Sequence, residues 1–431
     1  MRIVLLTPGT GSFLCGSCLR DNALTRELRA LGHDVVIAPL YLPFALEDGE
    51  EENSEVHLGG VNMYLQQKLP ALRHLPRFLR DRLDSPGLLR WLARRSNMTG
   101  AAGLGPMTLS MLRGEEGRQR AELEQLVTWM RSIERPDVVL LSNAMLLGLA
   151  RELKRALGCP ILCTLQGEAP FLDELPEPFR ADCWRELAHR AEDVDGFLAV
   201  SRFTAGLMGE RMQLDAERVH VVWNGIETED FAALPERPSQ PPTIGYLARM
   251  CADKGLPTLF DAFLLVRERI PDARLDAAGV VLGEDRALVA SLERRAREAG
   301  LQDAVSFRAN VSREEKLALL AGADVFSVPA TYGESFGLFV VEAWAAGTPV
   351  VQPRHGGFPE LVEDTGAGLL CEPDDPRSLA DGLCALLEDP ARAGRLGALG
   401  REAVLERFTA ARMAREVDAV CRMCTAAAGR A

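Results

Sequence analysis

The sequence of 431 residues has no apolar run that approaches the ~20 residues of a membrane-spanning helix. The apolar stretch Ile3 to Leu6 is also too short for a secretory signal, and it leads directly into a glycine-containing segment. Short repeats and low-complexity tracts are missing as well. These absences argue against a membrane-spanning, secreted or repeat protein, and we expect a cytoplasmic chain that begins with a strand.

Positive charge is also scarce, since the formal net charge is −13. General binding of nucleic acid relies on a cationic surface that neutralises phosphates, so we expect no nucleic-acid partner. Any phosphate-binding site must therefore be basic only locally. Hydrophobic residues make up 47% and charged residues 26% of the chain, a globular composition, and the length suggests two domains of roughly 200 residues each.

Ten cysteines without a secretion signal suit a reducing compartment, where most cysteines are small buried apolar residues. Two pairs have the spacing of redox or metal-binding motifs, Cys15 with Cys18 and Cys421 with Cys424. A redox role and a zinc site joining the pairs are both open alternatives. Since neither pair has a thioredoxin-like context, we expect cysteines that serve packing.

The first half of the chain alternates apolar strands with helical stretches, which is the pattern of a doubly wound α/β domain. Prolines interrupt any regular element between Leu234 and Thr243, and a second βα series follows. We therefore predict domains at 1–234 and 243–408, with a C-terminal helix and tail at 409–431. The predicted strands are Ile3–Thr7, Asp34–Ala38, Val138–Leu141, Ile161–Leu165, Phe197–Val200 and Val219–Val222, then Thr243–Leu247, Leu275–Val280, Ala304–Phe307, Val325–Val328, Pro349–Val351 and Gly368–Leu370. Helices are predicted at Leu19–Leu31 and Met145–Leu157, and Ser312 with Glu315 forms a capping box that begins another.

An insert at about 48–117 departs from this rhythm. An acidic run over 47–55 precedes a basic stretch over 68–95, in which leucines recur at helical spacing. A basic amphipathic hairpin could touch an anionic membrane from the cytoplasmic side. It could equally pack on the domain with a solvated charged face, which is the commoner use of such runs.

Two carboxylates eight residues apart, Glu334 and Glu342, bracket a predicted strand, turn and helix. Glu334 is expected in the loop at the carboxyl end of the strand, where α/β sheets bind ligands, and Glu342 in the second turn of a helix that begins near Gly337. Free backbone N–H groups near Phe336, Gly337 and Leu338 would face an anion. One carboxylate can then bind sugar hydroxyls and the other ribose hydroxyls. An ordinary amphipathic helix with a solvated glutamate is the structural alternative.

Two cations, Arg249 and Lys254, lie five residues apart in a loop between a predicted strand and helix. An arginine fork and a lysine point charge suit a diphosphate leaving group. By contrast, the loop with Gly9 and Gly11 after the first strand has Leu14 where a dinucleotide loop has its third glycine. Since the second strand also ends without an acidic residue, we expect no NAD-type site.

Together these motifs resemble glycosyltransferase family 4, the retaining transferases of the GT-B fold. The resemblance covers Arg249 to Gly255, Glu334 to Glu342 and the segment Gly356-Gly357-Phe358-Pro359-Glu360, and it extends to Trp223-Asn224-Gly225-Ile226-Glu227. It implies two Rossmann-like domains facing across a cleft, with the C-terminal helix crossing back to the first domain. It implies no metal or other cofactor.

The resemblance also implies roles for individual residues. Arg249 and Lys254 would hold the donor diphosphate, Glu334 the donor sugar and Glu342 the ribose, with the backbone at Phe336, Gly337 and Leu338 near phosphate and sugar. The loop at Gly9 and Gly11 would close over the diphosphate or acceptor, and Arg308 would border the base. Gln166 stands where the family commonly has a histidine, and although it can hydrogen-bond a sugar it cannot titrate near neutral pH.

The expected activity is transfer of a hexose, with retention, from a nucleotide sugar, first of all a UDP sugar, to a hydroxyl of a sugar, lipid or small-molecule acceptor. A nucleotide-sugar epimerase on the same fold would share Arg249 and Glu342 but need no acceptor. A non-catalytic nucleotide-sugar-binding protein is the third alternative. It stays open because Gln166 replaces the usual histidine.

Overall fold

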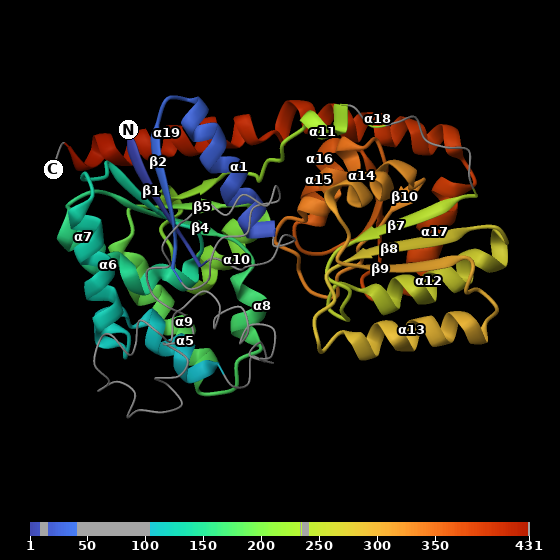
Figure 1. Ribbon diagram of the computed structural model, residues 1–431, viewed down its shortest axis with the longest axis horizontal. Helices are drawn as coiled ribbons and strands as arrows, with labels where there is room; N and C mark the ends of the chain where they lie inside the picture. Colours follow the sequence, from blue (N-terminus) through green and yellow to red (C-terminus); the bar gives the residue numbers. More distant parts are fainter. Residues whose placement is uncertain (9–15, 41–103, 233, 235–240, 430–431) are drawn as a thin grey trace. The chain divides into compact units, whose positions relative to one another are not determined.

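The structure is a computed structural model that describes residues 1–8, 16–40, 104–232, 234 and 241–429 (Figure 1). The chain divides into two compact units. Unit 1 comprises Met1–Val222 with Met413–Ala431, and unit 2 comprises Trp223–Arg412. The division at Trp223 therefore falls before the proline-rich segment between Leu234 and Thr243, where the sequence analysis placed the domain boundary. Residues 235–240 of that segment lie outside the described residues.

Unit 1 is built on a six-stranded sheet in the order β2-β1-β3-β4-β5-β6. All of its strand pairs are parallel, and the strands are short and almost wholly buried in the centre, as expected for a sheet covered on both faces. The strands are β1 (Arg2–Thr7), β2 (Asp34–Pro39), β3 (Val138–Leu141), β4 (Ile161–Leu165), β5 (Gly196–Ala199) and β6 (Val219–Val221).

Alternate residues of these strands enter two separate cores. Val4 and Leu6 of β1 pack in one core, and Ile3 and Leu5 pack in the other against α1 (Gly16–Ala30) and α19 (Ala410–Ala428). Figure 1 shows α1 and α19 on the same side of this sheet. The prediction that the C-terminal helix returns to the first domain is confirmed, since α19 packs with unit 1 from Met413 onward.

The other described helices of unit 1 connect or cover the strands. Part of the predicted insert 48–117 belongs to this fold, because Leu109 and Leu112 of α5 are buried in the core. The predicted helix over 145–157 is a 3-10 helix followed by an α-helix. These elements are α5 (Gly105–Leu112), η3 (Gly114–Glu116), α6 (Arg120–Ser132), η4 (Ala144–Leu149), α7 (Ala150–Leu157), α8 (Glu168–Asp173), α9 (Phe179–Arg190), η5 (Ala191–Asp193), α10 (Arg202–Met212) and η6 (Ala216–Arg218).

Unit 2 has a second parallel sheet of six strands, in the order β12-β11-β10-β7-β8-β9. Figure 1 shows α12 and α13 on one side of this sheet and α14, α15 and α16 on the other. The elements are α11 (Glu229–Ala232), β7 (Thr243–Leu247), α12 (Leu256–Arg269), β8 (Arg274–Gly279), α13 (Arg286–Glu298), β9 (Val305–Ala309), α14 (Arg313–Gly322), β10 (Val325–Phe326), α15 (Leu338–Ala345), β11 (Val350–Pro353), α16 (Phe358–Thr365), β12 (Gly368–Cys371), α17 (Pro376–Leu387) and α18 (Pro390–Arg407). The prediction of two doubly wound α/β domains is confirmed.

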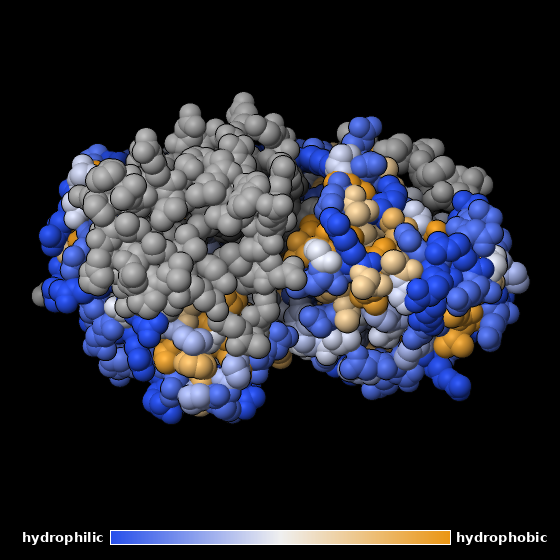
Figure 2. Space-filling view, turned by 60° about the horizontal axis from the view of Figure 1, so that its bottom comes forward, coloured by the Kyte–Doolittle hydropathy of each residue, from blue (hydrophilic) through white to orange (hydrophobic). Residues whose placement is uncertain are grey.

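The surface of unit 2 mixes apolar and charged side chains. In Figure 2 apolar side chains gather toward the middle of its visible face and hydrophilic ones toward its outer edge. None of the helices in the described part of the chain combines the length and the apolar character that crossing a bilayer requires.

Candidate functional site

The predicted site in unit 2 lies where the strand order reverses. Strand β7 is the first of the sheet, and the chain adds β8 and β9 on one side of it but β10, β11 and β12 on the other. The loops after β7 and β10 therefore leave the same edge of the sheet on either side of this switch point. Doubly wound sheets bind their ligands at such a point, outside the carboxyl ends of the strands.

Lys254 and Glu334 join these two loops directly. Lys254 Nζ donates a hydrogen bond to Glu334 Oε2, and the Tyr332 hydroxyl donates to the same oxygen over 3.1 Å. The Lys254 ammonium also lies 5.0 Å from the centre of the Tyr332 ring, within cation–π range. The structure thus brings two predicted site residues, 80 positions apart in the sequence, into one ion pair.

The surroundings keep this lysine charged. Burial alone would lower the pKa of Lys254, but the attraction of Glu334 and the hydrogen bonds to Glu334 and Tyr332 outweigh it and raise the pKa. For Tyr332, burial and the Glu334 carboxylate raise the pKa of the phenol, against the effect of Lys254. The site therefore presents an ammonium ion and a neutral phenol at every pH in ordinary use.

The backbones of the two loops are also fitted to each other. Thr331 N donates to Asp253 O over 2.9 Å. Gly255 has a φ of +71°, and a Cβ at this position would lie 1.7 Å from Pro329 O. Only glycine permits both this backbone conformation and this approach. The spacing between Lys254 and Glu334 is therefore fixed by the fold.

Arg249 belongs to the same loop but is held on the β8 side. Its Nε donates to Asp285 Oδ2 over 2.8 Å and its Nη2 to Asp285 Oδ1 over 3.1 Å, while Glu284 also accepts from Nη2. Burial would lower the pKa of Arg249, but the hydrogen bonds that it donates to Asp285 and Glu284 outweigh this effect and raise the pKa. Arg249 and Lys254, the two residues predicted to bind the diphosphate, are thus positioned by different carboxylates.

Helix α15 begins at the predicted place. Its N-cap is Gly337, with a φ of +89°, and a Cβ there would lie 2.9 Å from the Phe358 ring. The first N–H groups of a helix have no acceptor within the helix, so the backbone at Gly337 and Leu338 is suited to an anion. The Phe336 side chain is buried, so only its backbone is suited to ligand binding.

Glu342 lies on α15 and pairs with Lys316 of α14. Lys316 Nζ donates to Glu342 Oε1 over 3.0 Å, and the side chains are only 9% and 15% exposed. Helix α14 begins with the predicted capping box of Ser312 and Glu315, which is confirmed. A carboxylate can accept more than one hydrogen bond, so this pairing leaves Glu342 with further capacity for hydroxyls.

The loop after β11 supports Glu334 from the other side. Gly357 N donates to Glu334 O over 2.7 Å, and His355 Nε2 lies 2.8 Å from Ala330 O. Gly356 has a φ of +63°, and a Cβ there would lie 2.6 Å from the Glu334 backbone. The Gly356-Gly357 segment singled out in the sequence therefore shapes the loop that carries Glu334.

Arg308 is placed differently from the loop residues. It lies on β9, and its Nε and Nη2 hold the Asp276 carboxylate of neighbouring β8 over 3.1 and 2.7 Å. Its partner is thus a strand residue, and its predicted position beside a base stays a prediction. Of the residues predicted in unit 1, Gly9 and Gly11 lie outside the described residues.

Gln166, also in unit 1, is engaged at both ends of its amide. Its Nε2 donates to Ser142 O over 2.6 Å, and its Oε1 accepts from Ser17 Oγ over 2.9 Å. Nearby Glu168 accepts from Gln166 N over 2.7 Å and from Ala144 N over 2.8 Å. Gln166 therefore ties α1 to the ends of β3 and β4, and its predicted contact with the donor stays a prediction.

Sequence reasoning missed three supporting residues of unit 2, namely Asp285, Lys316 and Tyr332. Tyr332 stands two residues before Glu334 and offered a polar aromatic signal. Asp285 and Lys316 gave no signal, because their partners become neighbours only when β8 and α14 pack beside the loops.

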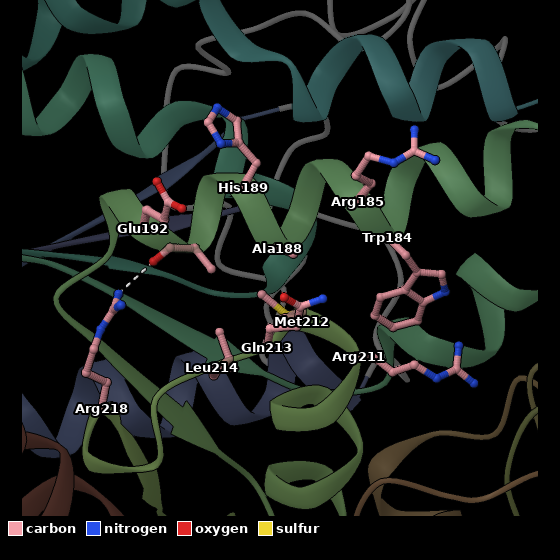
Figure 3. A pocket seen from close by; sticks show the side chains of 11 residues that line it. Trp184, Arg185, Ala188, His189, Glu192, Arg211, Met212, Gln213, Leu214 and Arg218 are labelled. Carbon is pink, nitrogen blue, oxygen red and sulfur yellow. Dashed lines mark hydrogen bonds between the residues drawn. The ribbon is translucent and has the colours of Figure 1, made fainter.

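Unit 1 has a cavity of about 570 Å³. None of the residues that the sequence predicted to bind a substrate lines it. Figure 3 shows it between α9 and the turn after α10, with Trp184, Arg211 and Arg218 at its margins. Its arginines are already satisfied, since Arg211 holds Asp173 and Arg218 donates to Ala191 O over 2.6 Å. We assign it no ligand.

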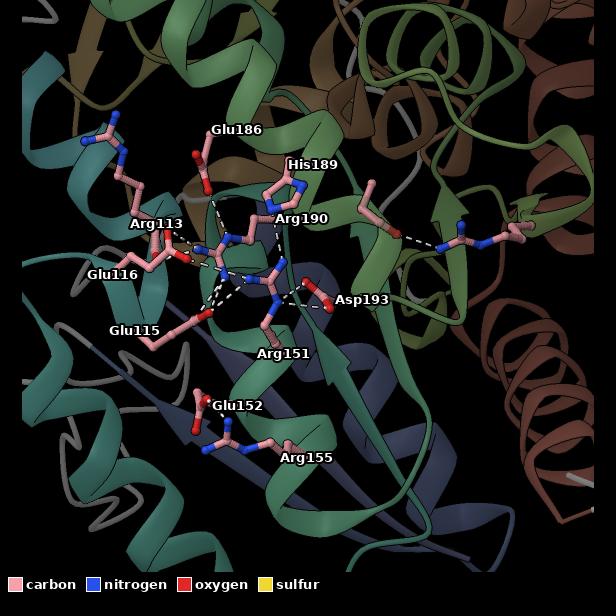
Figure 4. A network of polar contacts seen from close by, with 12 residues as sticks. Arg113, Glu115, Glu116, Arg151, Glu152, Arg155, Glu186, His189, Arg190 and Asp193 are labelled. Carbon is pink, nitrogen blue, oxygen red and sulfur yellow. Dashed lines mark hydrogen bonds and ion pairs between the residues drawn. The ribbon is translucent and has the colours of Figure 1, made fainter.

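A network of charges beside this cavity fixes the helices of unit 1 (Figure 4). The Arg190 guanidinium is fully buried and donates to both oxygens of Glu115 over 2.9 Å, and Arg151 bridges Glu115 and Asp193. Every member has an opposite charge at hand, which is the arrangement of a structural network. In the described ranges, no three His, Cys, Asp or Glu side chains gather as a metal site.

Comparison with known proteins identifies the family. Residues 103–230 match the family described as Glycosyltransferase Family 4, and residues 227–403 match Glycosyl transferases group 1. A D-inositol 3-phosphate glycosyltransferase of Xylanimonas cellulosilytica is 34% identical over 250 residues, 54% of this chain and 58% of that protein. A phosphatidyl-myo-inositol mannosyltransferase of Mycobacterium leprae is 33% identical over 217 residues, 49% of this chain and 55% of that protein. The chain thus spans a little over half the length of these relatives.

Solved structures match nearly the whole chain. Anabaena Alr3699/HepE in complex with UDP and glucose has a TM-score of 0.70 at 17% identity, covering 98% of this chain and 100% of that one. Sucrose-phosphate synthase from Thermosynechococcus elongatus has a TM-score of 0.70 at 20% identity, covering 99% of both. These likenesses show the two-domain GT-B fold. The two family matches, which together span residues 103–403, place this chain in glycosyltransferase family 4.

Proposed function

We propose that the protein transfers a hexose from a nucleotide-diphosphate sugar to an acceptor hydroxyl, with retention of the anomeric configuration. One observation supports this most strongly. Lys254 and Glu334, from loops on opposite sides of the switch point in unit 2, form one ion pair beside the start of α15. A cation for phosphate, a carboxylate for hydroxyls and a helix N-terminus then meet in one place.

The cations serve the leaving group. As the glycosidic bond breaks, negative charge develops on the nucleoside diphosphate, and Lys254 stabilises it because its raised pKa keeps it charged. Arg249 Nε and Nη2 are used by Asp285, so we propose that Nη1 faces the diphosphate. The N–H groups of Gly337 and Leu338 add dipoles of the same sign.

The carboxylates orient the donor. Glu334 Oε2 already accepts from Lys254 and Tyr332, so we propose that Oε1 accepts hydroxyls of the sugar. Glu342 Oε2 would accept a ribose hydroxyl while Lys316 keeps Oε1 in place. Retention would follow from attack on the face that the diphosphate leaves, with the leaving phosphate accepting the proton of the acceptor hydroxyl, so that no side-chain base and no metal is needed.

The names of the relatives suggest which nucleotide sugars and acceptors to consider first. A Mycolicibacterium smegmatis relative, 31% identical over 231 residues, is named as GDP-mannose-dependent, whereas the HepE structure holds UDP. UDP sugars are our first proposal and GDP-mannose the second. Relatives named for inositol 3-phosphate and phosphatidyl-myo-inositol suggest a phosphorylated polyol or its lipid as acceptor. A lipid acceptor would bring the chain to the cytoplasmic surface of the membrane. Residues 68–95, which the sequence predicted to contact an anionic membrane, lie outside the described residues.

The proposal is tested by incubating the protein with UDP-glucose or GDP-mannose and either inositol phosphate or phosphatidylinositol vesicles. We expect a nucleoside diphosphate and a glycosylated acceptor in equal amounts, with an α-linked product from these α-linked donors by NMR. A β-linked product would overturn retention. Isomerised nucleotide sugar formed without acceptor would favour an epimerase, and donor binding without any turnover would favour a binding protein.

A further inference from the structure

Unit 1 has a switch point of its own, between β1 and β3. The chain adds β2 on one side of β1 and β3 to β6 on the other. On the face covered by α1, apolar side chains of these strands give way to hydroxyls at the carboxyl edge. Ile3 and Leu5 are followed on that face by Thr7. Val138 and Leu140 are followed by Ser142, and both Thr7 and Ser142 are buried.

Helix α1 places a charged pair against this polar edge. Arg20 and Asp21 are 1% and 0% exposed, and Arg20 Nη1 donates to Asp21 Oδ1 over 2.9 Å. The Ser142 and Thr7 hydroxyls lie close enough to Asp21 to lower the pKa of its carboxyl, although burial raises that pKa more. Ser17, one turn earlier on α1, reaches the end of β4 through Gln166. Asp21 thus lies against the ends of β1 and β3, and Ser17 of the same helix against the end of β4.

The guanidinium of Arg20 is only half used. Its Nε and Nη2 are buried and make no hydrogen bond. Nε and Nη2 form one edge of the guanidinium, the edge with which Arg249 holds both oxygens of Asp285 in unit 2. Arg20 therefore presents a buried two-point fork without an acceptor.

Such a fork requires an explanation, because buried polar groups in native proteins are nearly always paired and an unpaired one is costly. A guanidinium fork matches the oxygens of a phosphate or carboxylate in two parallel hydrogen bonds. The Asp21 carboxyl and the Ser142 hydroxyl, on α1 and after β3, have the chemistry to hydrogen-bond the hydroxyls of a polyol. The location at the carboxyl ends of β1 and β3 is where such sheets bind ligands.

We infer that Arg20 is the oxyanion-binding residue of the acceptor site in unit 1, where its Nε and Nη2 bind a phosphate ester of the acceptor. This assignment rests on the proposed transfer to an acceptor, but it concerns a different unit and a different ligand from the donor.

The test measures phosphate-ester binding without any nucleotide sugar, so it does not depend on catalysis. In a Lys254→Met background, which removes a cation from unit 2, we would titrate inositol phosphate and, separately, inorganic phosphate by calorimetry. Hydrogen exchange of the peptide covering Gly16–Ala30 would locate the binding. We expect protection of this peptide in the protein that retains Arg20.

Arg20→Lys keeps the charge opposite Asp21 but removes the fork. We expect it to weaken binding of the phosphate ester about ten- to a hundred-fold, the usual range for losing a charge-assisted hydrogen bond. Arg26→Lys, an exposed arginine of the same helix, is the matched control and should bind like the parent. Inositol without phosphate should bind equally weakly to all three proteins.

The outcomes separate this inference from the proposed function. Phosphate binding with α1 protected but no transfer from any donor would leave the site in place and refute the activity. Transfer with an unchanged acceptor KM in Arg20→Lys, or phosphate binding without protection of α1, would refute the site. If Arg20→Lys does not fold, protection of α1 in the parent protein decides.

Two further hydrogen-exchange measurements distinguish a soluble phosphate ester from a lipid head group. Soluble inositol phosphate that protects α1 indicates a small phosphorylated acceptor. Protection only by vesicles that contain phosphatidylinositol, and not by phosphatidylcholine vesicles, indicates a lipid head group. Protection by neither, nor by inorganic phosphate, overturns the inference.

Discussion

Lys316 Nζ lies 3.0 Å from Glu342 Oε1, so the carboxylate predicted to bind ribose is held by a lysine from a different helix. Both side chains are largely buried. The pair links α14 to α15 behind the donor loops. It means that the position of Glu342 depends on a residue that the motif itself does not contain.

Replacing Lys316 by Met should destabilise the protein by about 3 kcal/mol, because it leaves a largely buried carboxylate without its partner. Urea unfolding of the variant and its parent measures this difference. Lys316→Met combined with Glu342→Leu should recover much of the loss, since both charges are then removed. A single variant as stable as its parent would show that Glu342 does not need the pair.

Gly255→Ala should separate the two donor loops. The new Cβ would lie 1.7 Å from Pro329 O and the residue would keep a φ of +71°, so we expect a loss of about 3 kcal/mol or more and much weaker nucleotide binding. Gly300→Ala is a matched control, because Gly300 has the same φ but no atom within 4 Å of the new Cβ. It should cost only about 1 kcal/mol of conformational strain. Equal losses in the two variants would contradict the close fit of the loops.

The sequence predicted the strands and the two-domain fold well, because runs such as Val138–Leu141 and Ile161–Leu165 are continuous and bounded by turn residues. It also assigned Lys254 and Glu334 to loops that follow strands of the same domain, and the structure joins them in one ion pair. The sequence could not predict which residues hold the predicted ligand-binding side chains in position. Asp285 and Lys316 are brought to Arg249 and Glu342 by packing between segments distant in the sequence.

Glu168 should give the protein a measurable pH dependence. Burial raises the pKa of Glu168 more than the backbone N–H groups of Ala144 and Gln166 lower it. The folded state then holds the proton more tightly than the unfolded state, so this contribution to stability is full below about pH 4 and is lost as the pH rises through the folded pKa. The free energy of unfolding should therefore fall between pH 4 and pH 7 more steeply in the parent than in Glu168→Gln. Glu124→Gln, at a largely exposed position, should follow the parent, and identical slopes in all three would contradict the buried acid.

The described cysteines should react slowly while the protein is folded. All nine are buried thiols outside any disulfide, and burial raises the pKa of Cys159 to about 11 and of Cys371 to about 12. Cys421 and Cys424, on the buried face of α19, pack in the core, as expected for packing residues. At pH 8 we expect at most one fast thiol per chain with a disulfide reagent, Cys15, and ten in urea. Rapid reaction of Cys421 or Cys424 in the folded protein would revive the redox alternative.

Unit 1 shows the other limit of sequence reading. The segment with Cys15 and Cys18 drew attention for its thiols, whereas the structure directs attention to Arg20 and Asp21 just after it. Their significance lies in burial and in unpaired atoms, which spacing does not reveal. Gln166 was judged as a replacement for histidine, yet its hydrogen bonds to Ser17 and Ser142 show that it also holds α1 against the sheet.

The central claim is that Lys254 and Glu334 form the phosphate and sugar end of a donor site, and calorimetric titration with UDP and GDP tests it most directly. Lys154→Met, which removes a half-buried lysine paired with Asp195 in unit 1, is the control. We predict that Lys254→Met binds the preferred nucleotide at least about tenfold more weakly than the parent, as expected for losing a charged hydrogen bond, while Lys154→Met binds it unchanged. Equal affinity in the parent and in Lys254→Met would contradict the account.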